Sequence, residues 1–341
     1  NCANLKSVSI AAGAETAYIG NATFKDCTSL EEITVPGNYT TIYSDAFRGC
    51  RSLKKFVYND NGISRKIQNR AFYECTSLVS LSLPTSLNSI GDEAFSGCSS
   101  LTAVDIPEGV KLIEYGVFNN CKLLKKVVIP STIQRIGNSY NTGAFQNCTS
   151  LSTVTIKEGT QAATIGSNTF SGCSAITSIV IPGNYSNVMD SAFKDCKGLK
   201  TLTYSPSING ITHKIGSYVF ENCQSLAQVT LGTGLESIDT KAFYNDSMIA
   251  EVNIPVGVKS IGQEAFSNCT RLSKLTLPEG LTVIKSGAFA SCKSLKSVVI
   301  PSTVTRVTDS YVAGAFENCT GLTSVTFKEG IAEAVIGQDS F

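Results

Sequence analysis

The chain has 341 residues, of which 42% are hydrophobic and 16% are charged, and its 28 basic and 27 acidic side chains leave a net charge of +1. This balance argues against a surface built to bind nucleic acid or an anionic membrane. No apolar run approaches the ~20 residues that would span a bilayer, so no transmembrane segment is expected in this chain.

A phenylalanine recurs every 23–27 residues from one end of the chain to the other. The series is Phe24, Phe47, Phe72, Phe95, Phe118, Phe145, Phe170, Phe193, Phe220, Phe243, Phe266, Phe289, Phe316 and Phe341. In twelve units a cysteine follows three residues later, Asp246 takes its place in one, and Cys2 fits the same position in a unit whose Phe would precede residue 1. We therefore expect a single array of about fourteen repeats over residues 1–341, cut within a repeat at both ends.

Each repeat reads roughly C-x-x-L-x-x-I-x-I-P-x-x-(V/L)-x-x-I-G-x-x-A-F-x-x-C. In residues 297–300, Val298 and Ile300 alternate with Ser297 and Val299, which predicts a short strand. Proline directly follows that strand in eight repeats, and it would end the strand because it lacks a ladder N–H. The A-F-x-x-C segment suits a turn or a single helical turn. Neither piece buries its apolar face alone, so the repeats are expected to stack around a shared core.

These elements predict an α/β fold, a solenoid with one parallel sheet along one face and short helical turns or loops opposite. The expected core ladder includes Phe95, Cys98, Phe118, Cys121, Phe266, Cys269, Phe289 and Cys292. A parallel β-helix is the structural alternative. The single strong strand per repeat and the A-F turn favour the first arrangement.

The repeats resemble the leucine-rich repeats of the BspA-like type, because L-x-x-I-x-I-P followed by I-G-x-x-A-F-x-x-C recurs over essentially the whole chain. The resemblance implies a right-handed leucine-rich-repeat solenoid that is secreted or displayed on a cell surface. It also implies adhesion to a protein ligand such as a host or matrix protein. It carries no catalytic residues.

The cysteines do not suggest chemistry, since about a dozen equivalent positions are not one special nucleophile beside a base. His213 is the only histidine and is interpreted as a solvated loop residue. Equal stacking gives no converging zinc ligands, and parallel side chains point the same way rather than toward a disulfide partner. We expect a column of buried, reduced thiols, with Asn245, Asp246 and Ser247 forming a more polar and exposed coil. No catalytic, metal-binding or cofactor-binding residue and no cofactor is predicted.

A larger duplication overlies the repeats. PGNYTTIYSDAF from Pro36 matches PGNYSNVMDSAF from Pro182, and the segment from Ile129 matches that from Ile300, which indicates a duplication of roughly residues 24–170 in residues 170–341. The longest repeats carry insertions such as NDNGISRK near Asn59 and PSINGITHK near Pro206. Insertions in a solenoid often mark a binding face, and neutral loop variation is the other interpretation.

The predicted function is non-enzymatic protein binding or adhesion along the repeat face and its duplicated loops. Loop tyrosines are the candidate contacts, because binding hot spots favour Tyr and the chain has no Trp: Tyr39, Tyr43, Tyr140, Tyr185 and Tyr311. The alternatives are a passive spacer that holds another domain and, more remotely, a thiol-dependent enzyme. End-to-end or edge association is also considered, since bare coil ends offer unpaired strands.

Overall fold

The computed structural model describes residues 1–139, 142–308, 313–330, 335–337 and 340–341. These residues fall into two compact units, Asn1–Ile176 (unit 1) and Thr177–Phe341 (unit 2). Each unit is a solenoid of parallel strands, and the described ranges contain no helix. The predicted solenoid and parallel pairing are confirmed, but the α/β class and the short helical turns are wrong.

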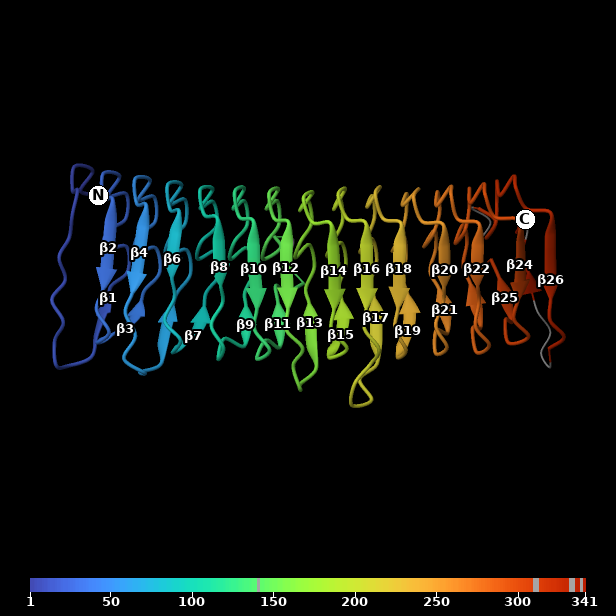
Figure 1. The fold of residues 1–341 in the computed structure, drawn as a ribbon, viewed down its shortest axis with the longest axis horizontal. Helices are drawn as coiled ribbons and strands as arrows, with labels where there is room; N and C mark the ends of the chain where they lie inside the picture. Colours follow the sequence, from blue (N-terminus) through green and yellow to red (C-terminus); the bar gives the residue numbers. More distant parts are fainter. Residues whose placement is uncertain (140–141, 309–312, 331–334, 338–339) are drawn as a thin grey trace. The chain divides into compact units, whose positions relative to one another are not determined.

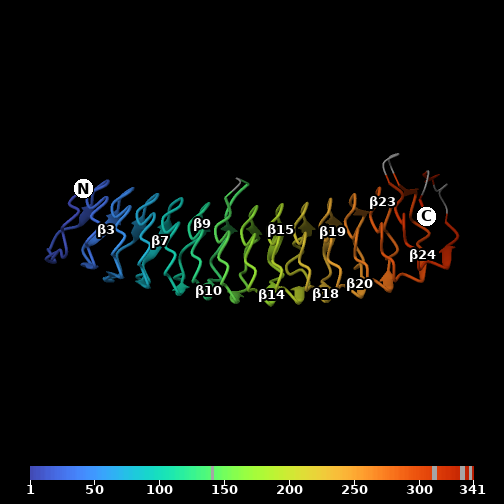
Figure 2. The same ribbon diagram turned by 90° about the horizontal axis from the view of Figure 1, so that it is seen from above.

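Two strands per coil, rather than one, build each unit, and they form two rows. Figure 2 separates the rows, with odd-numbered strands along one edge of the ribbon and even-numbered strands along the other. In unit 1 the odd row runs in the order β1 (Ala17–Ile19), β3 (Tyr39–Ile42), β5 (Arg65–Ile67), β7 (Leu87–Ile90), β9 (Leu112–Ile113), β11 (Arg135–Ile136) and β13 (Ala163–Ile165). In unit 2 it runs β15 (Tyr185–Val188), β17 (His213–Ile215), β19 (Leu235–Ile238), β21 (Ser260–Ile261), β23 (Val283–Ile284), β25 (Arg306–Val307) and β27 (Val335–Ile336).

The even row is divided into smaller sheets. Unit 1 has one sheet of β2 (Glu32–Val35), β4 (Lys55–Tyr58) and β6 (Ser80–Ser82), and another of β8 (Ala103–Asp105), β10 (Lys126–Ile129) and β12 (Thr153–Ile156). Unit 2 has β14 (Ser178–Ile181), β16 (Thr201–Tyr204) and β18 (Gln228–Leu231), then β20 (Glu251–Asn253) with β22 (Lys274–Thr276), then β24 (Ser297–Ile300) with β26 (Ser324–Phe327). The even strands are the ones that the sequence predicted.

The odd strands escaped prediction because their side chains do not alternate strictly. In β7, Leu87 and Ile90 are both fully buried, while Asn88 and Ser89 between them face outward. Register shifts in β1, β5 and β17 show the same irregularity. Two inward residues separated by two outward ones lack the period of two by which a half-buried strand is recognised.

The A-F-x-x-C corner is a run of turns rather than a helical turn. Around Phe95, the amide of Ser96 donates to the backbone carbonyl of Glu93, and the amide of Cys98 donates to the backbone carbonyl of Phe95. Each acceptor lies three residues before its donor. The intervening amides of Phe95 and Gly97 instead donate to Val117 and Asn119 of the next coil, at 2.9 and 2.8 Å. Glu93 and Gly97 have positive φ of 52° and 76°. A helix cannot form because every second N–H belongs to the next coil and two residues adopt the left-handed conformation.

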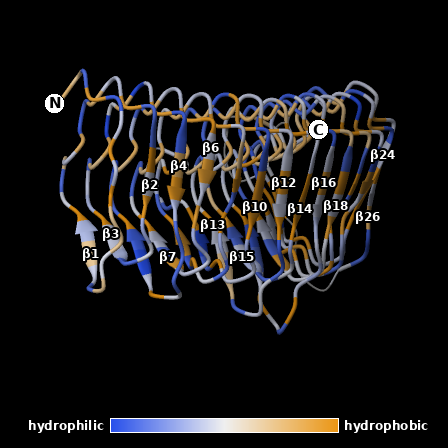
Figure 3. Cartoon of the chain, turned by 60° about the vertical axis from the view of Figure 1, so that its left-hand side comes forward, coloured by the Kyte–Doolittle hydropathy of each residue, from blue (hydrophilic) through white to orange (hydrophobic). Residues whose placement is uncertain are grey.

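Most of the repeating Phe and Cys side chains lie inside the two units, and those at the chain ends, such as Phe341 and Cys2, are exposed. Neighbouring Phe rings stack with centroids 4.9–5.4 Å apart within each unit. All eight side chains of the expected core ladder are 0% exposed. Figure 3 shows both hydrophilic (blue) and hydrophobic (orange) stretches along even strands such as β4 and β10.

The repeated cysteine is a hydrogen-bond donor as well as a small apolar side chain. The Sγ of Cys98 lies 3.3 Å from the carbonyl oxygen of Phe72, and that of Cys121 lies 3.3 Å from Phe95, so each thiol donates to a Phe of the preceding coil. All thirteen cysteines are free, and all but Cys2 are buried. Sulfur thus donates to a carbonyl at the tight corner of most coils.

Asp246, which replaces one of these cysteines, is also 0% exposed. The expectation of an exposed polar coil around it is wrong, because the backbone of this corner is built as in neighbouring coils. The backbone amide of Asn245 donates to the Ser267 carbonyl, and that of Ile249 donates to the backbone carbonyl of Asp246. Neither carboxylate oxygen of Asp246 has a hydrogen-bond partner. Burial raises the pKa of Asp246 well above its ordinary value; the nearby backbone of Cys223 acts in the opposite direction, and the charge of Glu221 adds to the rise.

Candidate binding edge

The turns that lead from each even strand to the next odd strand form one edge of each unit, which we call the loop edge. Figure 1 shows these turns along its lower side, where the insertions after β12 and β16 project furthest. The insertions are residues 59–64 and 157–162 in unit 1 and residues 205–212 in unit 2. Three of the inserted segments therefore lie on the loop edge, whereas a further one, which begins at Gly137, follows the odd strand β11.

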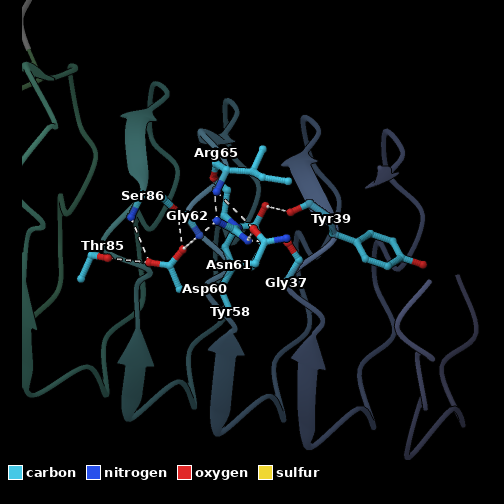
Figure 4. A network of polar contacts seen from close by, with 10 residues as sticks. Gly37, Tyr39, Tyr58, Asp60, Asn61, Gly62, Arg65, Thr85 and Ser86 are labelled. Atoms are coloured by element: carbon cyan, nitrogen blue, oxygen red, sulfur yellow. Dashed lines mark hydrogen bonds and ion pairs between the residues drawn. The ribbon is translucent and has the colours of Figure 1, made fainter. Parts of the chain in front are cut away.

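Arg65 at the start of β5 holds the first insertion in place. Its side chain is 0% exposed, and Figure 4 shows it surrounded by the loop residues. Nη1 donates to Asp60 Oδ1 at 2.9 Å, to the Ile63 carbonyl at 2.6 Å and to Ser86 Oγ, while Nη2 donates to Asn61 Oδ1 and to the Gly37 carbonyl. The guanidinium also lies over the ring of Tyr58, 5.4 Å from its centroid. One buried cation thus ties three coils together.

Asp60 is the anionic partner in this network. It accepts from the hydroxyl of Thr85 at 2.6 Å, from the hydroxyl of Ser86 at 2.6 Å and from the amide of Gly62 at 2.9 Å. The Ser86 hydrogen bond, followed by those from Thr85 and Gly62, holds the pKa of Asp60 well below its usual range. The loop therefore keeps a carboxylate at physiological pH, opposite a permanently charged guanidinium.

We expect Arg65→Met to destabilise unit 1 by about 3 kcal/mol, because it leaves the Gly37 and Ile63 carbonyls without their donor and removes the partner of Asp60. Urea unfolding followed by far-UV circular dichroism measures this. Lys66→Met is the matched control, since Lys66 is exposed and is expected to change stability by less than about 0.5 kcal/mol. Equal effects from the two variants would contradict the anchoring role of Arg65.

The predicted contact tyrosines have different surroundings. Tyr39 is half-buried at the start of β3; its ring points away from Arg65, and its carbonyl accepts from the Tyr58 hydroxyl at 2.9 Å. Tyr43 is also half-buried and meets Tyr18 edge-on, with ring centroids 5.3 Å apart. Tyr18, which sequence reasoning missed, is 65% exposed. Tyr140 and Tyr311 lie outside the described residues.

Tyr185 and His213 are interior residues of unit 2. Tyr185 is 1% exposed, and this burial takes it out of the candidate contact set. His213 is 0% exposed, so the interpretation of a solvated loop histidine is wrong. It starts β17 and stacks on Tyr204, with ring centroids 4.6 Å apart and an interplanar angle of 5°. The sequence placed His213 in an insertion, but the strand that buries it was not predicted.

A matching exposed cluster, in which a glutamate accepts hydrogen bonds from a lysine and a serine of the following coils, occurs in each unit. In unit 1, Glu108 accepts from Lys157 Nζ at 2.8 Å and from Ser131 Oγ at 3.2 Å. In unit 2, Glu279 accepts from Lys328 Nζ at 2.8 Å and from Ser302 Oγ at 2.9 Å. The lysine hydrogen bond is the main cause of the lowered pKa of both glutamates. The large sequence duplication is the signal that could have found this pair.

Burial keeps most of the interior thiols protonated. It raises the pKa of Cys50 to about 12 and the pKa of Cys98 further. The pKa of Cys319 is instead lowered, mainly by its hydrogen bond with Cys292. In the described ranges, no three His, Cys, Asp or Glu side chains come together as a metal site. No helix in the described part of the chain is long and apolar enough to cross a membrane.

The chain belongs to the BspA-type leucine-rich-repeat family, whose pattern matches residues 1–123, 124–214 and 205–314. It is similar to a leucine-rich repeat protein from Bacteroides ovatus ATCC 8483, with 26% identity and a TM-score of 0.56 over 90% of this chain and 87% of that one. It shares its fold with the pneumococcal vaccine antigen PcpA, at 22% identity and a TM-score of 0.53, covering 92% and 84% of the two chains. No curated protein matches it.

Proposed function

We propose that this chain is a non-enzymatic binding protein that contacts a protein ligand, such as a host or matrix protein, through its loop edge and the neighbouring tyrosines. The observation that carries this is the insertion 59–64, whose base is fixed by buried Arg65 while its tip, including the 41% exposed Ile63, faces solvent. A rigid loop loses little conformational entropy on binding. Tyr18 and Tyr43, whose rings meet edge-on, add aromatic surface on the odd row of the first coils, and half-buried Tyr39 lies at the start of β3.

Family membership supports display on a cell surface or secretion, and a right-handed winding of the coil, as further parts of this proposal. One array of about fourteen repeats, duplicated as a block, stays a prediction from the sequence. The raised pKa values of most interior thiols disfavour a thiol-dependent enzyme, since the thiolate is the nucleophile. The passive spacer stays the second candidate, because a stiff scaffold serves that purpose too.

Binding to immobilised collagen, laminin and fibronectin, measured by surface plasmon resonance, tests the proposal. We expect binding to at least one of them, and a loss of about thirtyfold in affinity (~2 kcal/mol) when Tyr18 and Tyr43 are both changed to alanine. Tyr218→Ala is the matched control, since Tyr218 is 37% exposed but lies at a corner of unit 2 away from the loop edge. No binding to any of the three would favour the spacer, whereas equal losses in both variants would contradict a specific role for Tyr18 and Tyr43.

We also expect this binding to change by less than about threefold between about 0.1 and about 0.5 M salt. The reason is that the exposed charges of the loop edge are balanced, as in the Lys157–Glu108 and Lys328–Glu279 pairs, and the net charge is +1. Affinity measured across a salt series checks this. A decline of tenfold or more would mean that a charged surface, rather than the tyrosines and the loop, drives binding.

A further inference from the structure

The two units use different residues to hold the same insertion. Arg65 and His213 occupy matching places, each just after an Asn-Gly loop tip and two residues before a buried Ile. Arg65 reaches the Gly37 carbonyl, and His213 Nε2 lies 3.0 Å from the carbonyl of the matching Gly183. Arg65 lies over Tyr58, and His213 stacks on the matching Tyr204. The anchor position is therefore shared, but only one of the two anchors is permanently charged.

The surroundings of His213 fit only the neutral imidazole. A carbonyl only accepts hydrogen bonds, so Nε2 must carry the proton that it donates to Gly183. Nδ1 then holds the lone pair, and it is buried without a hydrogen-bond partner. A second proton at Nδ1 would create a buried cation whose new N–H has no acceptor, a state that interiors strongly disfavour.

Among the described residues, no carboxylate acts on the His213 imidazole to compensate for such a charge. The ring that stacks on His213 is that of Tyr204, whose hydroxyl donates a hydrogen bond to the backbone carbonyl of Tyr185. In the neighbouring strand β19, the residue paired with His213 is Leu235. The charged residues that follow these two in sequence, Lys214 and Glu236, are exposed. Unit 1 differs because Asp60 faces Arg65, whereas Ser205 and Pro206 follow β16 at the corresponding place in unit 2.

We propose that His213 is an acid-sensitive latch, which holds the insertion 205–212 on the loop edge while its imidazole is neutral and releases the insertion when Nδ1 gains a proton. Arg65 holds the matching insertion 59–64 across the same pH range. The insertions of the two units therefore respond differently to acid, so a partner that contacts insertion 205–212 is bound less tightly at low pH. This last step depends on the proposed function, whereas the latch itself does not.

The direction of the pH dependence follows from the burial of His213. Burial lowers the pKa of His213, with the Gly183 carbonyl acting in the opposite direction. The unfolded loop then binds the proton at a higher pH than the folded loop does. The stabilisation is complete above the ordinary histidine pKa of about 6.5 and is lost as the pH falls through the lowered folded value.

Selective labelling of histidine gives a direct measurement, because His213 is the only histidine in the chain. An NMR titration of its imidazole reports the proton, and hydrogen exchange followed by mass spectrometry reports the two insertions at each pH. We expect the imidazole to titrate below 6.5, and the protection factors of residues 205–213, corrected for intrinsic rates, to drop by up to about tenfold per pH unit in the same range. Residues 59–65 should keep theirs.

Two variants make the test decisive. His213→Gln can still donate to Gly183 but cannot titrate, so residues 205–213 should lose their pH dependence. Arg65→His places an imidazole beside the Asp60 carboxylate, so insertion 59–64 should show the opposite response and be better protected in acid. A His213 pKa at or above 6.5, or the same loss of protection in acid for His213→Gln, would overturn the proposal. None of these measurements uses a binding partner, so their outcome is independent of whether the loop edge binds a protein.

Discussion

We expect Phe118→Ala to lower the free energy of unfolding by about 3–5 kcal/mol, because it removes a large side chain from an interior that cannot collapse around the cavity. Phe118 is 0% exposed and is stacked on both sides, 5.4 Å from Phe95 and 5.2 Å from Phe145. The amide of Phe118 also donates to Ala144 of the next coil, so the ring sits on backbone fixed by the solenoid itself. Urea unfolding followed by far-UV circular dichroism gives the difference.

Leu123→Ala in the same repeat is the matched control, since Leu123 is 50% exposed and should change stability by less than about 0.5 kcal/mol. Phe118→Leu should fall between the two, because leucine fills part of the cavity without restoring the stack. If Phe118→Ala were as mild as Leu123→Ala, the stacked rings would not be what holds successive coils together.

The interior of the fold was largely predictable, because every repeat places the same side chain at the same depth. The spacing of Phe95, Cys98 and Phe118 alone indicates a stacked core, and their burial follows from one coil adding to the next. The predicted strand 297–300 also coincides with β24. Repetition averages out local ambiguity, so a weak period becomes clear when it recurs.

The second strand row and the corners were not predictable in the same way. β7 buries its first and fourth residues, and its short length and register irregularity hide it from a search for alternation. At the corner, the apolar pair Ala94–Phe95 suggested a helical turn, but alternate amides bond to the next coil. Those intercoil hydrogen bonds are a tertiary feature, and local propensity does not contain them.

The candidate site was only partly predictable. The insertions were located from repeat length, but the burial of Arg65 and His213 was not, because a charged or polar residue in an insertion ordinarily faces solvent. The tyrosines show the same limit: Tyr39 and Tyr185 occupy matching sequence positions, and only Tyr39 keeps part of its surface. Sequence position identifies the loop edge, whereas packing against neighbouring coils decides which of its side chains remain exposed for binding.

We expect Asp246→Cys to stabilise unit 2 by about 3 kcal/mol at pH 7, because it replaces a buried carboxyl that has no hydrogen-bond partner with the thiol that the corner is built to hold. The neighbouring coils show what the thiol gains, since Cys269 Sγ lies 3.4 Å from the Phe243 carbonyl and Cys223 Sγ lies 3.3 Å from that of Phe193. Chemical unfolding under reducing conditions measures the difference.

The pH dependence separates this explanation from a simple packing effect. Because burial raises the pKa of Asp246, the folded chain binds a proton more tightly than the unfolded chain, so the wild type loses stability as the pH rises above the ordinary aspartate value of about 3.9. The advantage of Asp246→Cys should therefore be small near pH 4 and grow toward pH 7. Taking the difference between the two proteins cancels the other carboxyl groups, which titrate in both.

Asp246→Asn keeps the shape without the charge, so its stability relative to Asp246→Cys should not change with pH. The reverse change, Cys98→Asp in unit 1, should introduce the same pH-dependent loss, because Cys98 is equally buried and donates to Phe72 in the same geometry. A constant advantage of Asp246→Cys from pH 4 to pH 7 would show that the carboxyl stays in one protonation state throughout, and that shape alone distinguishes the two side chains.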